Sequence, residues 1–161
     1  MNNGRPASNG TSAGVLICDD YAAIRRMLTV IVDQSPGLRV VGEAADGKEA
    51  IEKAQLLQPD VILLDLAMPA HTGLDALPTL RRVSPEARII VFSGFAEGLV
   101  AEQVIELGAV RYLEKSAEPA TIVATIHQVL QQAAPSPAEG RRSAPGESVS
   151  LQDPAVGLFP Q

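Results

Sequence analysis

The feature that most constrains the fold is an alternation of short aliphatic runs with segments of helical periodicity. Five largely apolar runs occupy residues 15–18, 38–43, 61–64, 88–92 and 110–113. Each is followed by apolar residues at helical spacing, over residues 24–32, 50–57, 74–80, 100–107 and 122–130. Strands that are apolar on both faces are typical of a parallel sheet covered by helices. The sequence therefore predicts a doubly wound α/β domain with five strands.

The two ends of the chain differ in composition from this core. Residues 1–13 are mostly Asn, Gly, Ser, Thr and Pro, and residues 134–161 are rich in Pro, Gly and Ser without helical or strand periodicity. Such segments bury too little apolar surface to fold. We therefore expect one domain over residues 14–133, between a disordered N-terminal segment and a disordered tail.

Composition narrows the class of protein. The net charge of −6 disfavours nonspecific binding to nucleic acids or anionic membranes, which depends on clustered Lys and Arg. The single cysteine, Cys18, excludes an internal disulfide and is expected in the core of the first strand. No apolar run approaches the roughly 20 residues that span a bilayer, and no secretory signal is recognisable. These features predict a cytoplasmic protein that does not insert in a membrane.

Reactive side chains gather where the predicted strands end. Asp19 and Asp20 follow the first strand, Asp65 the third and Ser93 the fourth, while Lys115 comes shortly after the fifth. In doubly wound sheets, ligands bind beyond the carboxyl ends of the strands. We therefore expect three carboxylates, a hydroxyl and an ammonium group at one edge of the sheet.

Three carboxylates in one place require positive charge. Two like charges about 4 Å apart repel by about 4 kcal/mol at an effective dielectric constant near 20. A divalent cation together with Lys115 would neutralise them, and an all-oxygen site suits Mg²⁺. A carboxylate beside Mg²⁺, Lys and a hydroxyl is equipped to attack phosphorus and become an aspartyl phosphate. Asp65 is the candidate nucleophile.

These strand-end residues resemble the receiver domain of two-component response regulators. The matching positions are Asp19, Asp20, Asp65, Pro69, Gly73, Ser93, Tyr112 and Lys115. The resemblance covers residues 14–133 and implies a flavodoxin-like fold with strand order 2-1-3-4-5. It also implies a phospho-accepting regulator in a phosphorelay, whose only chemistry is its own phosphorylation and dephosphorylation.

The resemblance assigns the acceptor and the metal ligands. Asp65 would accept a phosphoryl group from the phosphohistidine of a sensor histidine kinase or phosphotransfer protein. Asp20 and Asp65 would hold Mg²⁺, with Asp19 assisting and the backbone carbonyl of Ala67 as a further ligand.

It also assigns the residues that sense phosphorylation. Ser93 would bind the phosphoryl group by a hydrogen bond, Lys115 would pair with it, and Tyr112 would turn inward. This change would alter the face formed by the fourth helix, fifth strand and last helix, where a separate target protein would bind. The tail is too short and aperiodic for a helix-turn-helix output domain, so direct DNA binding is not expected.

Three positions depart from the family pattern. Ser116 stands where the family often has a proline in a cis bond, which leaves the conformation of the Lys115–Ser116 bond open. Ala67 has no polar side chain to contact the phosphoryl group or an attacking water. Pro78 implies that the third helix starts late or kinks.

Other functions are open to this fold. A Mg²⁺-dependent phosphohydrolase also forms an aspartyl phosphate at a strand end, but it usually needs a second Asp two residues later, where this chain has Ala67. A nucleotide-binding domain would need a glycine-rich phosphate loop, which follows none of the predicted strands. His71 and His127 are too isolated in the sequence to suggest ligands or catalysts.

Overall fold

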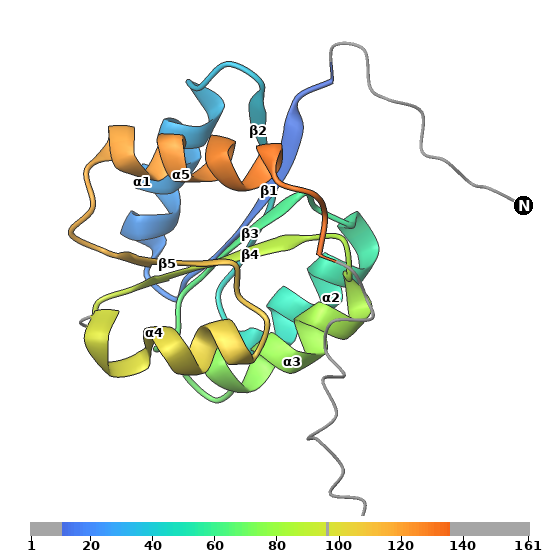
Figure 1. The fold of residues 1–161 in the computed structure, drawn as a ribbon, viewed down its shortest axis with the longest axis vertical. Helices are drawn as coiled ribbons and strands as arrows, with labels where there is room; N and C mark the ends of the chain where they lie inside the picture. Colours follow the sequence, from blue (N-terminus) through green and yellow to red (C-terminus); the bar gives the residue numbers. More distant parts are fainter. Residues whose placement is uncertain (1–10, 96, 136–161) are drawn as a thin grey trace, which may run out of the picture.

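The computed structural model describes residues 11–95 and 97–135 (Figure 1). Strands and helices alternate through them: β1 Ala13–Cys18, α1 Ala22–Asp33, β2 Leu38–Ala44, α2 Gly47–Leu57, β3 Val61–Leu64, α3 Gly73–Val83, β4 Arg88–Ser93, α4 Glu97–Glu106, β5 Arg111–Glu114 and α5 Pro119–Gln131. This confirms the predicted alternation. The two segments expected to be disordered fall mainly on residues 1–10 and 136–161, which lie outside the described residues.

The strands form one parallel sheet. Its order is β2-β1-β3-β4-β5 within the described residues, as the resemblance implied. Helices α1 and α5 cover one face of the sheet, and α2, α3 and α4 cover the other (Figure 1). The sheet order reverses direction at β1 and β3, so the crevice beyond the ends of these two strands is the place where ligands bind in such folds.

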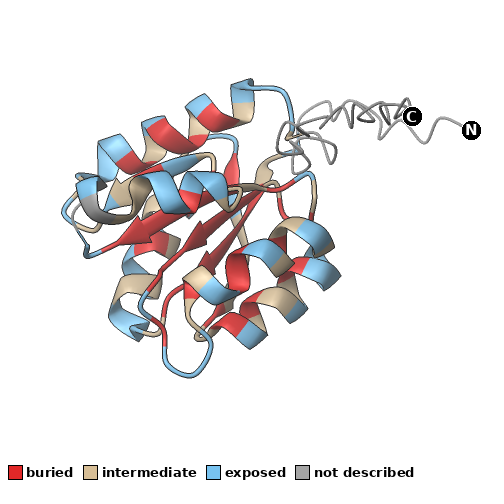
Figure 2. Cartoon of the chain, turned by 60° about the horizontal axis from the view of Figure 1, so that its bottom comes forward, coloured by how far each residue is buried: buried red, intermediate tan, exposed pale blue. Residues whose placement is uncertain are grey.

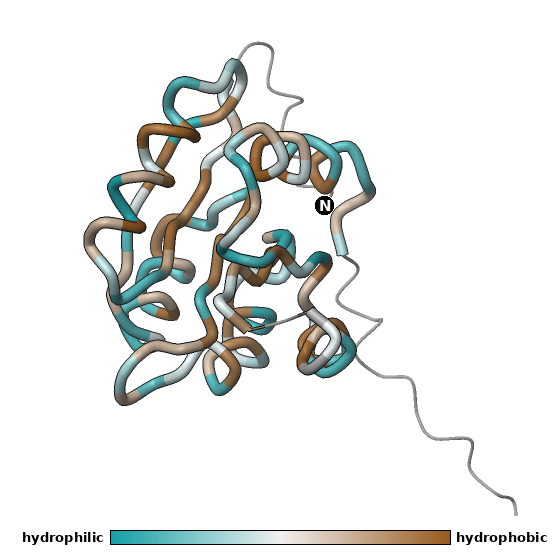
Figure 3. The backbone as a smooth tube through the Cα atoms, turned by 90° about the vertical axis from the view of Figure 1, so that its left-hand side faces the viewer, coloured by the Kyte–Doolittle hydropathy of each residue, from teal (hydrophilic) through white to brown (hydrophobic). Residues whose placement is uncertain are grey.

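The strands are buried on both faces. In β3 all four residues are buried, and alternate side chains enter different halves of the core: Val61 and Leu63 pack with α1 and α5, Ile62 and Leu64 with α2 and α3. Figure 2 shows the buried strands between helices whose outer faces are exposed. The hydropathy of the chain follows the same division, with hydrophobic strands inside (Figure 3). Burial on both faces explains why the strand sequences show no polar alternation.

Strand β2 contains an irregularity beside β1. Val15 pairs with Val40 but Leu16 pairs with Gly42, so Val41 is an extra residue in the edge strand. Such a bulge reverses the faces to which the following side chains point. Glu43 consequently points to the same side as Val40, toward α1.

Helix α3 does not start late. It begins at Gly73, with the Thr72 hydroxyl accepting a hydrogen bond of 3.1 Å from the Asp75 N–H, and it continues through Pro78. The N-cap and the burial of Ala76 and Leu77 outweigh the backbone hydrogen bond that the proline removes. Of the two consequences expected of Pro78, a late start or a kink, the late start was therefore wrong, and the kink stays a prediction. In the described part of the chain, no helix is long and apolar enough to cross a membrane.

Candidate functional site

Two neighbouring strands bring the three aspartates together. Asp19 and Asp20 directly follow β1, and Asp65 directly follows β3. Strands β1 and β3 pair with each other in the sheet. The Asp65 N–H donates to the Cys18 carbonyl at 2.9 Å, and the Asp19 N–H donates to the Ala44 carbonyl at 3.0 Å. One carboxylate oxygen from each aspartate lies within 4.8 Å of the others. The structure thus forms the acidic cluster that the sequence predicted.

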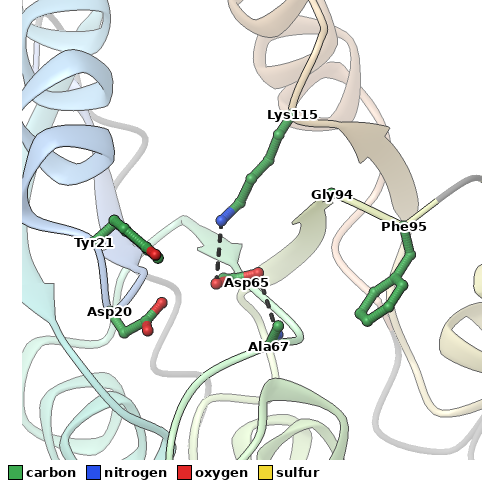
Figure 4. A pocket seen from close by; sticks show the side chains of 7 residues that line it. All are labelled: Asp20, Tyr21, Asp65, Ala67, Gly94, Phe95 and Lys115. Atoms are coloured by element: carbon green, nitrogen blue, oxygen red, sulfur yellow. Dashed lines mark hydrogen bonds and ion pairs between the residues drawn. The ribbon is translucent and has the colours of Figure 1, made fainter.

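Lys115 supplies the positive charge of the cluster. Its ammonium group lies 2.7 Å from Asp19 Oδ2 and 3.2 Å from Asp65 Oδ2. Its backbone N–H donates to the Ser93 carbonyl at 2.8 Å, which fixes the start of the loop after β5 to the end of β4. Figure 4 shows the lysine extending across the pocket toward Asp65.

Burial and charge perturb the groups of this cluster. The pKa of Asp65 is raised because the carboxyl is buried and Asp19 lies nearby, although Lys115 and the Ala67 N–H, 3.2 Å from Asp65 Oδ1, oppose the shift. Burial would lower the pKa of Lys115, but its hydrogen bond to Asp19 and the charges of Asp65 and Asp19 outweigh burial and raise it. Lys115 therefore stays charged, and the cluster is still short of positive charge.

The oxygen atoms of the cluster fit a magnesium ion. Asp20 Oδ1 is buried without a partner, and the buried Oδ2 atoms of Asp19 and Asp65 contact only the Lys115 ammonium. Unpaired buried carboxylate oxygens are costly, and Mg²⁺ takes carboxylate, carbonyl and water oxygens as ligands. The donor set is thus appropriate for the metal that the sequence predicted.

A cavity of about 270 Å³ opens beside the acidic cluster. It is lined by Asp20, Tyr21, Asp65, Ala67, Gly94, Phe95 and Lys115 (Figure 4). Tyr21 and Phe95 were not predicted from the sequence to line it. The available signal was their position: Tyr21 directly follows the acidic pair, and Phe95 lies two residues after Ser93.

Ser93 and Tyr112 meet the loop after β4 instead of the cavity. Ser93 is fully buried, and its hydroxyl accepts a hydrogen bond of 3.3 Å from the Phe95 N–H. Tyr112 is buried as well, and its hydroxyl donates to the Phe95 carbonyl. Tyr112 is thus buried in this structure, and its turn on phosphorylation stays a prediction. The N–H and the carbonyl of Phe95 are both held by hydrogen bonds.

The turn between β3 and α3 brings the helix close to the predicted phospho-acceptor. A Cβ atom at Gly73 would lie 1.9 Å from the Asp65 carbonyl oxygen, so only glycine fits. The Gly73 N–H also donates to the Leu66 carbonyl at 3.1 Å. Within this turn Ala70 has φ +62°, a left-handed conformation that is unfavourable for a residue with a Cβ.

The remaining candidate residues lie apart from the cavity. Cys18 is buried in β1 as predicted, and burial raises the pKa of its thiol. His71 is exposed in the turn before α3, and His127 is half-buried on α5. The described residues contain no cis peptide bond, so the bond between Lys115 and Ser116 is trans.

Comparisons with known proteins agree on one family. The family model of the response regulator receiver domain matches residues 15–127. The chemotaxis protein CheY of Thermotoga maritima is 36% identical over 115 residues, which are 71% of this chain and 95% of that protein. The nitrate/nitrite response regulator NarL of Escherichia coli is 39% identical over 121 residues, 75% of this chain but only 56% of that protein.

Solved structures resemble the fold in the same way. The CheX–CheY–BeF3–Mg complex from Borrelia burgdorferi has a TM-score of 0.71 and 27% sequence identity, and the match covers 76% of this chain and 92% of that one. The response regulator domain of Thermotoga maritima CheB has a TM-score of 0.67 and 34% identity, with 76% and 96% covered.

Proposed function

Because the chain belongs to the response regulator receiver family of two-component systems, and so is a phosphorylation-activated switch, we propose that Asp65 is its phospho-acceptor. One observation carries this assignment: the Asp65 carboxylate lies in the cavity wall, 3.2 Å from the Lys115 ammonium and beside two further carboxylates. Asp19 is also paired with Lys115, but it does not line the cavity.

The residues of the site have separate tasks in phosphoryl transfer. An Asp65 oxygen attacks the phosphorus of the donor, and the phosphorus–nitrogen bond breaks with its electron pair on the imidazole nitrogen of the donor's phosphohistidine. Lys115 pairs with the phosphoryl oxygens, and the Ala67 N–H holds the second carboxylate oxygen. Asp19, Asp20, Asp65 and the Ala67 carbonyl would hold Mg²⁺, which supplies further positive charge for the phosphoryl group.

Phosphorylation would be read through the loop after β4. The Ser93 hydroxyl accepts the Phe95 N–H, and the phosphoryl group offers that hydroxyl a new acceptor. A shift of Ser93 loosens one of the two hydrogen bonds on Phe95, while Tyr112 holds the other. The face formed by α4, β5 and α5 carries this change to a separate target protein.

Several wider assignments belong to the same proposal. The phosphoryl donor is a sensor histidine kinase or phosphotransfer protein, and the exchange takes place in the cytoplasm. Residues 14–133 act as the receiver, and direct DNA binding by this domain is not expected, in keeping with the net charge of −6. The match covers 56% of NarL, so no function of the remaining part of NarL is assigned to this chain. The phosphohydrolase alternative is not favoured, because Ala67 offers only a methyl group to the cavity.

Intact-mass measurement tests the acceptor. Wild type and Asp65→Ala are incubated with phosphoramidate and Mg²⁺, and Asp75→Ala, which removes an exposed aspartate of α3, serves as the matched control. Wild type and the control should gain one phosphoryl group that is lost at alkaline pH, as an acyl phosphate would be. Asp65→Ala should gain none. A phosphoryl group on Asp65→Ala would show that another residue is the acceptor.

A further inference from the structure

Arg25 of α1 connects the acidic cluster to the edge strand β2. One guanidinium nitrogen donates to the backbone carbonyl of Asp19 at 2.8 Å, and Nε lies 3.2 Å from Glu43 Oε2. The Arg25 side chain is 19% exposed and that of Glu43 is 41% exposed, so the ion pair between them is partly open to water. No role was predicted for Arg25 from the sequence, and the phosphoryl-transfer step does not use it.

Glu43 is itself fixed in place. Its other carboxylate oxygen accepts the Thr29 hydroxyl at 2.9 Å, and its backbone carbonyl accepts the Lys53 ammonium. The bulge at Val41 turns Glu43 toward α1, where it meets Arg25. A bulge that re-aims a side chain beside a functional site is a recurrent device of β-sheets.

The contact with the Asp19 carbonyl controls the position of Asp20. The peptide unit between Asp19 and Asp20 is planar, so a donor that fixes the carbonyl oxygen also fixes the direction in which the Asp20 Cα lies. Asp20 Oδ1 has no partner that could hold the side chain in place. The position of the Asp20 carboxylate therefore depends on the backbone. Arg25 holds the Asp19 carbonyl, while the Asp19 N–H donates to Ala44 and the Tyr21 N–H donates to Asp19 Oδ1.

Neither helix stability nor the charge of Arg25 explains its location. Arg25 is the fourth residue of α1, near the helix N-terminus, where the helix dipole disfavours a cation. Glu43 neutralises its charge, and Arg25 is not among the groups that shift the pKa of Asp65. The remaining effect of Arg25 is that its hydrogen bond orients the peptide between Asp19 and Asp20.

We propose that Arg25, braced by Glu43, is a positioning residue that orients the Asp19–Asp20 peptide so that the three carboxylates can share one divalent cation. This inference rests on the proposed function, in which the same carboxylates hold Mg²⁺. Hydrogen bonds that orient the residues coordinating a metal typically contribute about 10–100-fold to metal affinity.

The test compares Mg²⁺ affinity in matched variants by titration calorimetry, at a temperature where circular dichroism shows each variant folded. Arg25→Met should raise the Kd for Mg²⁺ about 10–100-fold. Arg25→Lys should not rescue it, because one ammonium cannot reproduce the fork that reaches both the Asp19 carbonyl and Glu43. Arg26→Met, which removes the same charge from the exposed neighbouring position, should leave the Kd unchanged.

A milder variant guards against misfolding. Glu43→Gln keeps the size of the side chain but cannot accept from both Arg25 and Thr29, so a smaller rise in Kd is expected. If Arg25→Met does not fold, the direction of the change in Kd in Glu43→Gln decides whether Arg25 is a positioning residue.

Several outcomes would overturn the inference. A wild-type Kd in Arg25→Met or Glu43→Gln, even with a lower melting temperature, would reduce Arg25 to a structural role. Full rescue by Arg25→Lys would assign the effect to charge. Absence of Mg²⁺ binding by wild type would remove the basis of the inference, whereas normal Mg²⁺ binding without phosphorylation of Asp65 would refute the proposed function and leave the positioning role standing.

Discussion

Replacing Asp65 by asparagine should stabilise the protein when no metal is present. Asp65→Asn keeps the shape of the side chain and removes one of three crowded carboxylates. One carboxylate oxygen of each aspartate lies within 4.8 Å of the others, so Asp19 and Asp20 each repel Asp65 by about 3.5 kcal/mol at an effective dielectric constant near 20. Lys115, at 3.2 Å, attracts it by about 5 kcal/mol on the same scale.

The two repulsions together exceed the attraction by about 2 kcal/mol, and the burial of Asp65 adds a desolvation penalty. Asp65→Asn should therefore raise the free energy of unfolding by about 2 kcal/mol, which corresponds to about 5–10 °C in melting temperature for a domain of this size. Urea unfolding in excess chelator measures the change, with Glu52→Gln, on the exposed surface of α2, as the control for loss of one negative charge.

The advantage of Asp65→Asn should depend on pH in a defined direction. The pKa of Asp65 is raised in the folded protein by burial and by Asp19, so the folded state binds the proton more tightly than the unfolded state. The ionised carboxylate therefore destabilises wild type above the folded pKa, and this penalty fades as pH falls toward the unfolded value. The variant should be more stable than wild type at neutral pH and equal to it in acid. Equal or lower stability of Asp65→Asn at neutral pH, relative to wild type and the Glu52→Gln control, would refute this electrostatic reasoning.

Three further substitutions test the turn and the loop around the site. Ala70→Gly should raise the free energy of unfolding by about 0.5–1 kcal/mol, because relief of the left-handed conformation exceeds the added entropy of the unfolded chain; denaturant titration showing a loss would contradict the strain. Gly73→Ala should cost more than about 3 kcal/mol, since its Cβ would overlap the Asp65 carbonyl; a normally stable variant in the same titration would mean that the turn can move. Tyr112→Phe removes the hydroxyl bond to the Phe95 carbonyl and should cost about 1 kcal/mol, with amide NMR shifts at Gly94 and Phe95; unchanged spectra would show that this bond does not hold the loop.

The sequence was sufficient to predict the elements because their burial is repetitive. A short apolar run such as residues 61–64 is typical of a strand covered on both faces, and the helical faces that follow each run supply the cover. Periodicity does not encode the order of strands in the sheet, which came from the family resemblance. The start of α3 at Gly73 was not singled out because the proline was judged alone, whereas the cap at Thr72 and the buried contacts of the helix act together.

The acidic cluster was predictable because parallel strands end at the same edge of the sheet. Adjacent strands deliver Asp19 and Asp65 to one point whatever the details of the side chains. The contact between Arg25 and Glu43 was not predictable in the same way. It depends on one extra residue in β2, and without this bulge the glutamate would point to the opposite face.

The three carboxylates stay close together because backbone hydrogen bonds fix their positions, although the carboxylates repel one another. Two repulsions of about 3.5 kcal/mol each are comparable with the 5–15 kcal/mol that stabilises a whole domain, so free side chains would move apart. Separation is resisted by backbone contacts: Asp65 N–H to Cys18, Asp19 N–H to Ala44, and Arg25 to the Asp19 carbonyl. The repulsion that these contacts maintain is relieved when a cation binds, and so adds to the affinity for it. Loosening the backbone and removing a charge should consequently have opposite effects on the metal-free protein, while both weaken Mg²⁺ binding.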